Sequence, residues 1–320
     1  MHKPAFLITI DTEGDNLWQK HDSITTENAR YLPRFQQLCE KYGFKPVWLT
    51  NYEMAIDPVY IEFAKDAIAR GTAEIGMHLH AWNSPPTDPL TDDDWRHKPY
   101  LIEYSDAAMR AKVDYMTRLL EDTFQTKMAS HRAGRWAFDE RYARLLVEYG
   151  YLVDCSVTPR VNWKTAKGAP QGDGGTDYRH FPQHAYFLDE NDIRREGQSS
   201  LLEVPMSIQY KHSAWMNSLK QGYDRLRGKV RSPSVHWLRP MGGNVETMKK
   251  VVEQTLTQGN DYVEYMLHSS EYMPGGSPTF KNEQDIERLY ADLDAFFSWL
   301  APQVKGMTLA EYYQQKLTQR

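Results

Sequence analysis

Two pairs of polar residues in this sequence stand two positions apart, each where a strand-like apolar run ends. Asp11 and Glu13 follow FLITI, and His78 and His80 close the run AEIGMHLH. Side chains alternate along a strand, so residues two apart share one face. Both members of each pair can therefore point the same way. A carboxylate and two imidazoles that converge on one point are ligands for zinc or a similar divalent ion.

Three further positions of the same kind carry groups suited to acid–base chemistry. His131 and Arg132 precede AGRW, Asp154 follows GYLV, and His268 follows YVEYML. An arginine can hold a catalytic carboxylate ionised through a bidentate pair, which is the role expected of Arg132. The imidazole pKa lies near neutrality, so His268 is a candidate general acid. Asp154 is a candidate to orient His268, as a buried carboxylate does in other catalytic pairs.

Each of these residues also has a plainer structural interpretation. Asp11 and Glu13 could cap a helix or lie in an exposed turn, and Asp154 could form an Asx turn. A lone histidine is more often a hydrogen-bonded core residue than a ligand, and this is the interpretation favoured for His131. The position of the clusters at strand ends favours the functional interpretation for the remainder, because catalytic groups in barrels come from the carboxyl ends of the strands.

The elements that would position these residues alternate between strand and helix. Strands are predicted at 5–10, 45–50, 73–80, 127–134 and 151–156, and helices at 27–42, 58–70, 106–124 and 139–149. Such alternation indicates a parallel sheet or barrel. It breaks at 158–200, and the run LLEVPMSI at 201–208 is strand-like. The alternation resumes near 234, with a strand at 262–268 and helices at 244–258, 283–300 and from 309. We expect one domain, residues 1–320, with an irregular insertion at about 158–233.

Composition limits the class of protein. Of the 320 residues 25% are charged and 41% hydrophobic, as in an ordinary soluble globular protein. The net charge of −5 offers no basic field, so no nucleic-acid partner is expected. Two cysteines cannot form a disulfide framework. No secretory signal and no bilayer-length apolar stretch is visible, which predicts a cytoplasmic protein without a membrane span.

Aromatic and basic residues near the predicted strand ends are candidates for substrate binding. Trp82, Trp136 and Arg135 are the first of these, and Trp163 and Trp237 lie in comparable places. Indole faces stack well on sugar rings, although for each tryptophan alone packing in the core or at the rim is the favoured interpretation. The basic stretch 213–231 is interpreted as a solvated helix face.

Taken in order, TIDTEGD, EIGMHLHAW, SHRAGRW, YLVDCS and MLHSSEY resemble the five ordered motifs of the polysaccharide deacetylase family. The resemblance covers roughly residues 4–160 and 234–316. It implies an α/β fold, a distorted (β/α) barrel with seven or so parallel strands. It also implies metal-dependent hydrolysis of an acetamido group.

The resemblance assigns roles to individual positions. Asp11 matches the catalytic base, and Arg132 matches the arginine that pairs with it. Asp154 resembles the acid that tunes the catalytic histidine, which His268 matches. Glu13 falls where some members place a metal carboxylate.

His78 matches the first metal histidine. Trp82 stands where the second metal histidine is usual, so His80 is expected to replace it. Two further departures are Asp-Thr-Glu in place of adjacent aspartates and Cys155 in place of a tryptophan.

The function expected from these motifs is a hydrolase of non-peptide carbon–nitrogen bonds that removes an N-acetyl group from an amino sugar in glycan or polysaccharide biosynthesis. One divalent ion, with zinc as the first expectation, would be held by Glu13, His78 and His80. A cytoplasmic enzyme suits a nucleotide-linked, lipid-linked or otherwise soluble acetamido sugar better than a finished wall polymer. The sequence assigns neither the particular sugar nor an oligomeric state.

Three alternatives stay open at this point: hydrolysis of another carbon–nitrogen bond, as in a cyclic ureide or imide; a non-catalytic sugar-binding protein; and a structural domain. The presence of both Asp11 and His268 disfavours the second, because binding needs no general acid. The polar strand ends disfavour the third.

Overall fold

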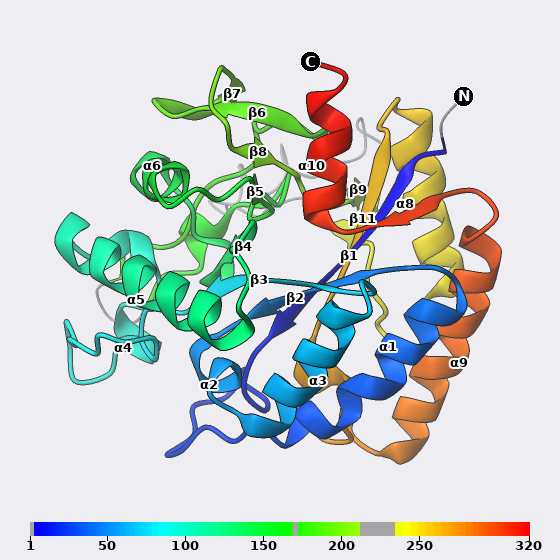
Figure 1. Cartoon of the computed structure of the whole chain (residues 1–320), viewed down its shortest axis with the longest axis horizontal. Coiled ribbons are helices and arrows are strands. Elements are labelled where there is room, and N and C mark those ends of the chain that lie inside the picture. Colours follow the sequence, from blue (N-terminus) through cyan, green and yellow to red (C-terminus); the bar gives the residue numbers. More distant parts are fainter. Residues whose placement is uncertain (1–2, 169–171, 212–233) are drawn as a thin grey trace, which may run out of the picture.

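The strands that carry the polar clusters lie side by side in one curved sheet (Figure 1). The computed structural model describes residues 3–168, 172–211 and 234–320. The sheet has the order β11-β1-β2-β3-β4-β5-β8-β6-β7, and β12 pairs with β1. Its strands are β1 (Ala5–Thr12), β2 (Pro46–Thr50), β3 (Glu74–Leu79), β4 (Ser130–Ala133), β5 (Val153–Asp154), β6 (Tyr186–Asp189), β7 (Asp192–Glu196), β8 (Leu202–Glu203), β11 (Tyr262–His268) and β12 (Lys305–Met307).

Neighbours from β11 through β8 run parallel, whereas β6 and β7 are antiparallel. The result is a curled half-barrel of mostly parallel strands, which confirms the expected fold class. Helices surround this half-barrel (Figure 1). They are α1 (Leu32–Lys41), α2 (Tyr52–Ala55), α3 (Pro58–Ala69), α4 (Asp94–His97), α5 (Asp106–Phe124), α6 (Glu140–Glu148), α8 (Val245–Thr257), α9 (Glu283–Leu300) and α10 (Leu309–Leu317). Among the described helices, none combines the length and apolar character needed to cross a bilayer.

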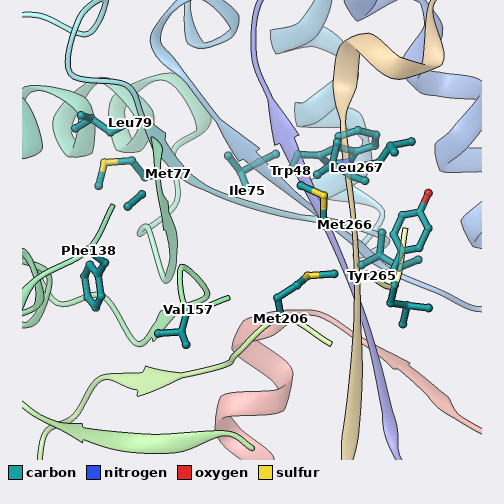
Figure 2. Packing of buried hydrophobic residues seen from close by; sticks show 14 of the residues in the cluster. Trp48, Ile75, Met77, Leu79, Phe138, Val157, Met206, Tyr265, Met266 and Leu267 are labelled. Carbon is teal, nitrogen blue, oxygen red and sulfur yellow. The ribbon is translucent and has the colours of Figure 1, made fainter. Parts of the chain in front are cut away.

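Strand β1 is buried along its whole length, as expected of a central parallel strand. Phe6, Ile8 and Ile10 pack in the large core between sheet and helices. Figure 2 shows part of this core, where Trp48, Ile75 and Leu267 come from β2, β3 and β11.

The alternate residues of β1 belong to the inner face. Ala5 and Leu7 pack in a second apolar cluster that includes Leu309 and Tyr312 of α10. Thr9 and Asp11 continue the same face, so the interior changes from apolar to polar toward the carboxyl ends of the strands. The functional residues are placed at that end.

The segment expected as an irregular insertion contains more regular structure than its sequence indicates. β8 extends the parallel sheet, and β6 and β7 form an antiparallel pair at its edge. β10 (Val235–Trp237), expected to resume the barrel alternation, instead pairs antiparallel with β9 (Ile208–Tyr210) in a separate two-stranded sheet. The basic stretch at 213–231 lies outside the described residues.

Candidate metal and catalytic site

Three residues from the carboxyl ends of β1 and β3 form a compact buried cluster. The candidate ligand atoms of Glu13, His78 and His80 all lie within 4.8 Å of one another. Nε2 of His80 is 2.8 Å from Oε2 of Glu13, and Nε2 of His78 is 3.5 Å from the same oxygen. The His78–His80 pair and Glu13, one member of the other pair, therefore converge on one point.

The surroundings of this cluster hold its rings in place. Nδ1 of His78 is 2.9 Å from the carbonyl oxygen of Arg132, so it can donate there while Nε2 faces Glu13. The turn after β4 packs directly on His80. A β-carbon at Gly134 would lie 2.4 Å from the Leu79 carbonyl oxygen and 2.7 Å from Nδ1 of His80, so only glycine permits this approach.

The donor set fits a divalent cation. Two imidazole nitrogens and one carboxylate oxygen are the ligand types that zinc takes in catalytic sites, where a fourth position stays open. Burial opposes ionisation of Glu13. Hydrogen bonds from His78 and His80 and the charge of His268 outweigh it, so the pKa of Glu13 lies well below its usual range. The carboxylate is thus anionic, as a ligand must be.

Asp11 lies beside this cluster and is held by Arg132. Nη1 of Arg132 donates to Oδ1 of Asp11 at 2.6 Å, and Nη2 donates to Thr9 at 2.7 Å and to Glu264 at 2.5 Å. The bidentate pair expected from the sequence is therefore a single hydrogen bond, because Nη2 is occupied by Thr9 and Glu264. Burial opposes ionisation of Asp11. The charges of Arg132, His78 and His268 outweigh it and lower the pKa of Asp11.

His268 faces Asp11 across the β1–β11 pair, in whose register the two residues are partners. Nε2 of His268 is 3.7 Å from Oδ2 of Asp11 and 3.9 Å from Oε1 of Glu13. Its other nitrogen, Nδ1, is 3.1 Å from Oε2 of Glu271, which also accepts from Arg239 at 2.6 Å. Burial lowers the pKa of His268, but the hydrogen bond to Glu271 and the nearby carboxylates raise it by more.

The prediction that Asp154 orients His268 is wrong. Asp154 accepts from Nδ1 of His131 at 2.6 Å, and Nε2 of His131 contacts the Tyr142 hydroxyl at 2.7 Å. The reason is strand alternation: Val153 and Cys155 belong to the inner cluster, so Asp154 faces outward. His131 is the hydrogen-bonded core residue that was expected.

Glu271 takes the orienting position instead, and sequence reasoning missed it. Its side chain also accepts from the His268 backbone N–H, which makes a capping box at the short helix Ser269–Tyr272. The spacing His-x-x-Glu directly after a strand is the signal that could have identified it.

A cleft of about 660 Å³ opens over these groups, and Trp82, Trp136 and Arg135 line it as expected. The wall is strongly aromatic: it also includes Trp18, Trp95, Tyr100, Trp163 and Trp237. The Trp82 ring centre lies 5.5 Å from that of His80, so the residue at the usual place of a second metal histidine packs on its replacement. Trp163 comes from the segment 158–200, which therefore helps to build the cleft.

No protein-family model matches the sequence, and a search of curated proteins finds no match. Solved structures do match. A protein from Mycobacterium smegmatis named for the polysaccharide deacetylases is 14% identical, with a TM-score of 0.57 over 100% of this chain and 92% of its own. A glycoside hydrolase/deacetylase-type protein from Parabacteroides distasonis is 10% identical, with a TM-score of 0.65 over 100% of this chain and 72% of its own.

The allantoinase Puue is 14% identical, with a TM-score of 0.53 over 97% of this chain and 89% of its own. At such low identity these likenesses establish a shared fold. They confirm the polysaccharide deacetylase-like fold that the five motifs imply.

Proposed function

We propose that this protein is a metal-dependent hydrolase that removes an N-acetyl group from an amino sugar. One observation carries the proposal: a buried Glu13–His78–His80 cluster stands beside Asp11 and His268, whose facing atoms are 3.7 Å apart. A metal-ligand set, an ionised carboxylate and an imidazole with a raised pKa are the groups that amide hydrolysis requires.

Glu13, His78 and His80 would hold the ion. When bound, a divalent cation supplies Lewis-acid polarisation of the acetamido carbonyl and stabilises the negative charge that develops on it.

Asp11 is placed to take a proton from the attacking water. The Arg132 guanidinium favours its ionised form and fixes Oδ1, which leaves Oδ2 toward the reacting groups.

His268 is placed to protonate the leaving nitrogen. Because Glu271 accepts from Nδ1, Nε2 faces the cleft, and the raised pKa favours the protonated ring. As the carbon–nitrogen bond breaks, the nitrogen takes this proton and the acyl carbon keeps the oxygen of water. The products are a free amino sugar and acetate.

The cleft favours a sugar over a small ureide or imide. A space of about 660 Å³ with several tryptophans on its wall offers stacking area for sugar rings. The Puue fold likeness makes ureide hydrolysis the competing reaction.

The deciding experiment measures metal content by mass spectrometry and acetate release from N-acetylglucosamine oligomers and a nucleotide-linked N-acetylglucosamine. Hydrolysis of allantoin and of hydantoin is measured in parallel as the test of ureide hydrolysis. Ureide hydrolysis without acetate release would overturn the proposed substrate class.

Variants test the roles in the same assays. Asp11→Asn and His268→Ala should keep their metal and lose at least ~100-fold in turnover, the usual scale for general acid–base groups. The double variant should be little worse than the poorer single variant. His80→Ala should lose metal first. Full activity in Asp11→Asn or His268→Ala would refute the assigned roles.

A further inference from the structure

Four buried polar atoms of the cleft have no partner in the described part of the chain, and three of them are hydrogen-bond donors; the fourth is Nδ1 of His80. The indole N–H groups of Trp82 and Trp95 and the Nε–H of Arg239 are buried and lack a partner within the described part of the chain. The carboxylates of the cleft already have cationic or imidazole neighbours, since Oδ1 of Asp11 accepts from Arg132 and Glu13 contacts His78 and His80. A wall rich in free donors is complementary to a ligand rich in acceptors.

Arg135 is a further donor on the wall of the cleft, and it carries a positive charge. Its hydrogen bond from Nη2 to the carbonyl oxygen of Trp95 is long at 3.4 Å. Among the described residues, no carboxylate oxygen lies within 4.0 Å of its guanidinium. Burial lowers its pKa, and the neighbouring Tyr100, Glu13 and Glu103 offset this only in part. Cζ of Arg135 lies 5.4 Å from the centre of the Trp95 ring, which is uncharged. The guanidinium thus has no anionic partner at salt-bridge distance in the described part of the chain.

Arg135 is also held in place beside the metal cluster. The backbone φ is 52° at Arg135 and 62° at Trp136, a left-handed conformation unfavourable for residues with a β-carbon. Such strain concentrates at functional sites. The preceding Gly134 packs on His80, so the turn that carries Arg135 is anchored to a candidate ligand.

A bound cation would reduce the negative charge that offsets the charge of Arg135. Glu13 is one of the groups that offset the charge of Arg135. As a metal ligand, Glu13 would share its charge with the ion, leaving Arg135 with less compensation from the protein.

We propose that Arg135 binds an anionic group, a carboxylate or a phosphate, that the substrate carries near the hydrolysed amide. The planar guanidinium fork matches either anion. This inference rests on the proposed function and narrows its substrate from acetamido sugars in general to acidic or phosphorylated ones. A neutral sugar would leave the Arg135 guanidinium without an anionic partner and the buried indole donors unpaired, which disfavours its binding.

Calorimetric binding measurements test the proposed anion site at Arg135 without requiring turnover. Metal-loaded protein is titrated by calorimetry with glucuronate, glucose 1-phosphate and neutral glucose. We expect at least one anion to bind more tightly than glucose, and Arg135→Asn to weaken that binding by ~10- to 100-fold, the scale of a lost hydrogen bond between charged groups. Anion binding that persists unchanged in Arg135→Asn would overturn the proposal.

Kinetics test specificity. Acetate release is compared for N-acetylglucosamine, 2-acetamido-2-deoxyglucuronate and N-acetylglucosamine 1-phosphate. The ratio of kcat/KM for the preferred anionic sugar over the neutral one should fall ~10- to 100-fold in Arg135→Asn and recover in part in Arg135→Lys. Whichever anionic sugar has the higher kcat/KM shows whether Arg135 binds a carboxylate or a phosphate. An unchanged ratio would overturn the role of Arg135 even in an active deacetylase.

The choice of variants controls for backbone strain, because asparagine tolerates the left-handed conformation. Arg144→Gln is the matched control, an exposed arginine that does not line the cleft. It should leave the ratio unchanged. If no sugar releases acetate but anions still bind in a way that depends on Arg135, the anion-binding role of Arg135 is supported and the proposed reaction is wrong. The two proposals can therefore be tested separately.

Discussion

Two histidines of the sheet have carboxylate partners yet occupy opposite environments. His268 faces the cleft with Glu271 behind it, whereas His131 is fully buried with Asp154 on the outer face of the sheet. Both pairs fix an imidazole through Nδ1. Only the first leaves the other nitrogen toward the reacting groups, because Nε2 of His131 already contacts Tyr142. The two histidine–carboxylate pairs are chemically alike, but we expect only substitutions in the His268–Glu271 pair to impair catalysis.

Substitution should separate the two pairs. Glu271→Gln removes the charge that orients His268, and kcat should fall ~10- to 100-fold with metal content and KM little changed. Glu271→Asp should recover part of this loss. Asp154→Asn should instead leave kcat within a few-fold and lower the free energy of unfolding by about 2 kcal/mol, because the buried hydrogen bonds that Asp154 makes with His131 and Ser156 are disrupted. Urea unfolding and turnover on the proposed substrate check both.

If Asp154→Asn lost turnover while its free energy of unfolding stayed unchanged, the catalytic role would belong to Asp154 and not to Glu271. Metal content of each variant, measured beside turnover, distinguishes a disturbed His268 from a disturbed ion.

At the scale of elements, segments with a clear pattern were predictable from sequence, and the segment without one was not. The helix expected at 106–124 is α5, and that at 283–300 is α9, with the same bounds. β8 lies in the strand-like run LLEVPMSI at 201–208, whereas the β6–β7 pair lies in a segment without clear period. Pairing with β8, a long-range contact, makes this segment regular, and local pattern cannot report such a contact.

The candidate ligands were predictable because alternation within a strand is local. Glu13, His78 and His80 needed only a spacing of two and a strand end. The partner of Asp154 required the register of β4 against β5, which pairs His131 with Asp154. Glu264 was missed because it stands within the apolar run YVEYMLH, although it lies four positions before His268 and so shares its face.

Glu264 belongs to a polar layer between the apolar end of the barrel and the site. It accepts hydrogen bonds from Arg132 and Thr9 and is fully buried. Burial raises its pKa from an ordinary 4.5 to about 7, and Arg132 and Thr9 offset this only in part. The folded state therefore keeps a proton on Glu264 that the unfolded state has released.

This difference predicts a pH dependence of stability. Between pH 4.5 and about 7 the folded state binds more protons at Glu264, so its contribution to stability falls as pH rises through that window. The slope is at most about 1.4 kcal/mol per pH unit. Glu264→Gln should remove this slope, measured as the difference from wild type in urea unfolding across pH 4.5–7.

Glu253→Gln is the matched control, because Glu253 is an exposed glutamate on α8. Parallel pH profiles for wild type and Glu264→Gln would contradict the assignment of a protonated Glu264 to the folded state.

At the scale of the molecule, the half-barrel separates stability from chemistry along the strand direction. One end is apolar and covered by α10, and the other gathers Glu13, His78, His80 and His268 from three strands. These residues are far apart in sequence, so the unfolded chain offers no preformed site. A ligand that binds them together binds the folded state alone.

Metal binding should therefore raise thermal stability. At free zinc of 100 times the dissociation constant, one site adds about 2.7 kcal/mol to the free energy of unfolding. The melting temperature of metal-stripped protein should rise on zinc addition, and a chelator should reverse the rise.

Asp11→Asn should keep the response, because Asp11 is not a proposed ligand, whereas His80→Ala should lose most of it. His184→Ala, an exposed histidine paired with Glu196, is the matched control and should respond like wild type. A zinc-dependent rise that survives in His80→Ala would place the ion elsewhere, since the two remaining groups, Glu13 and His78, could not hold it as tightly.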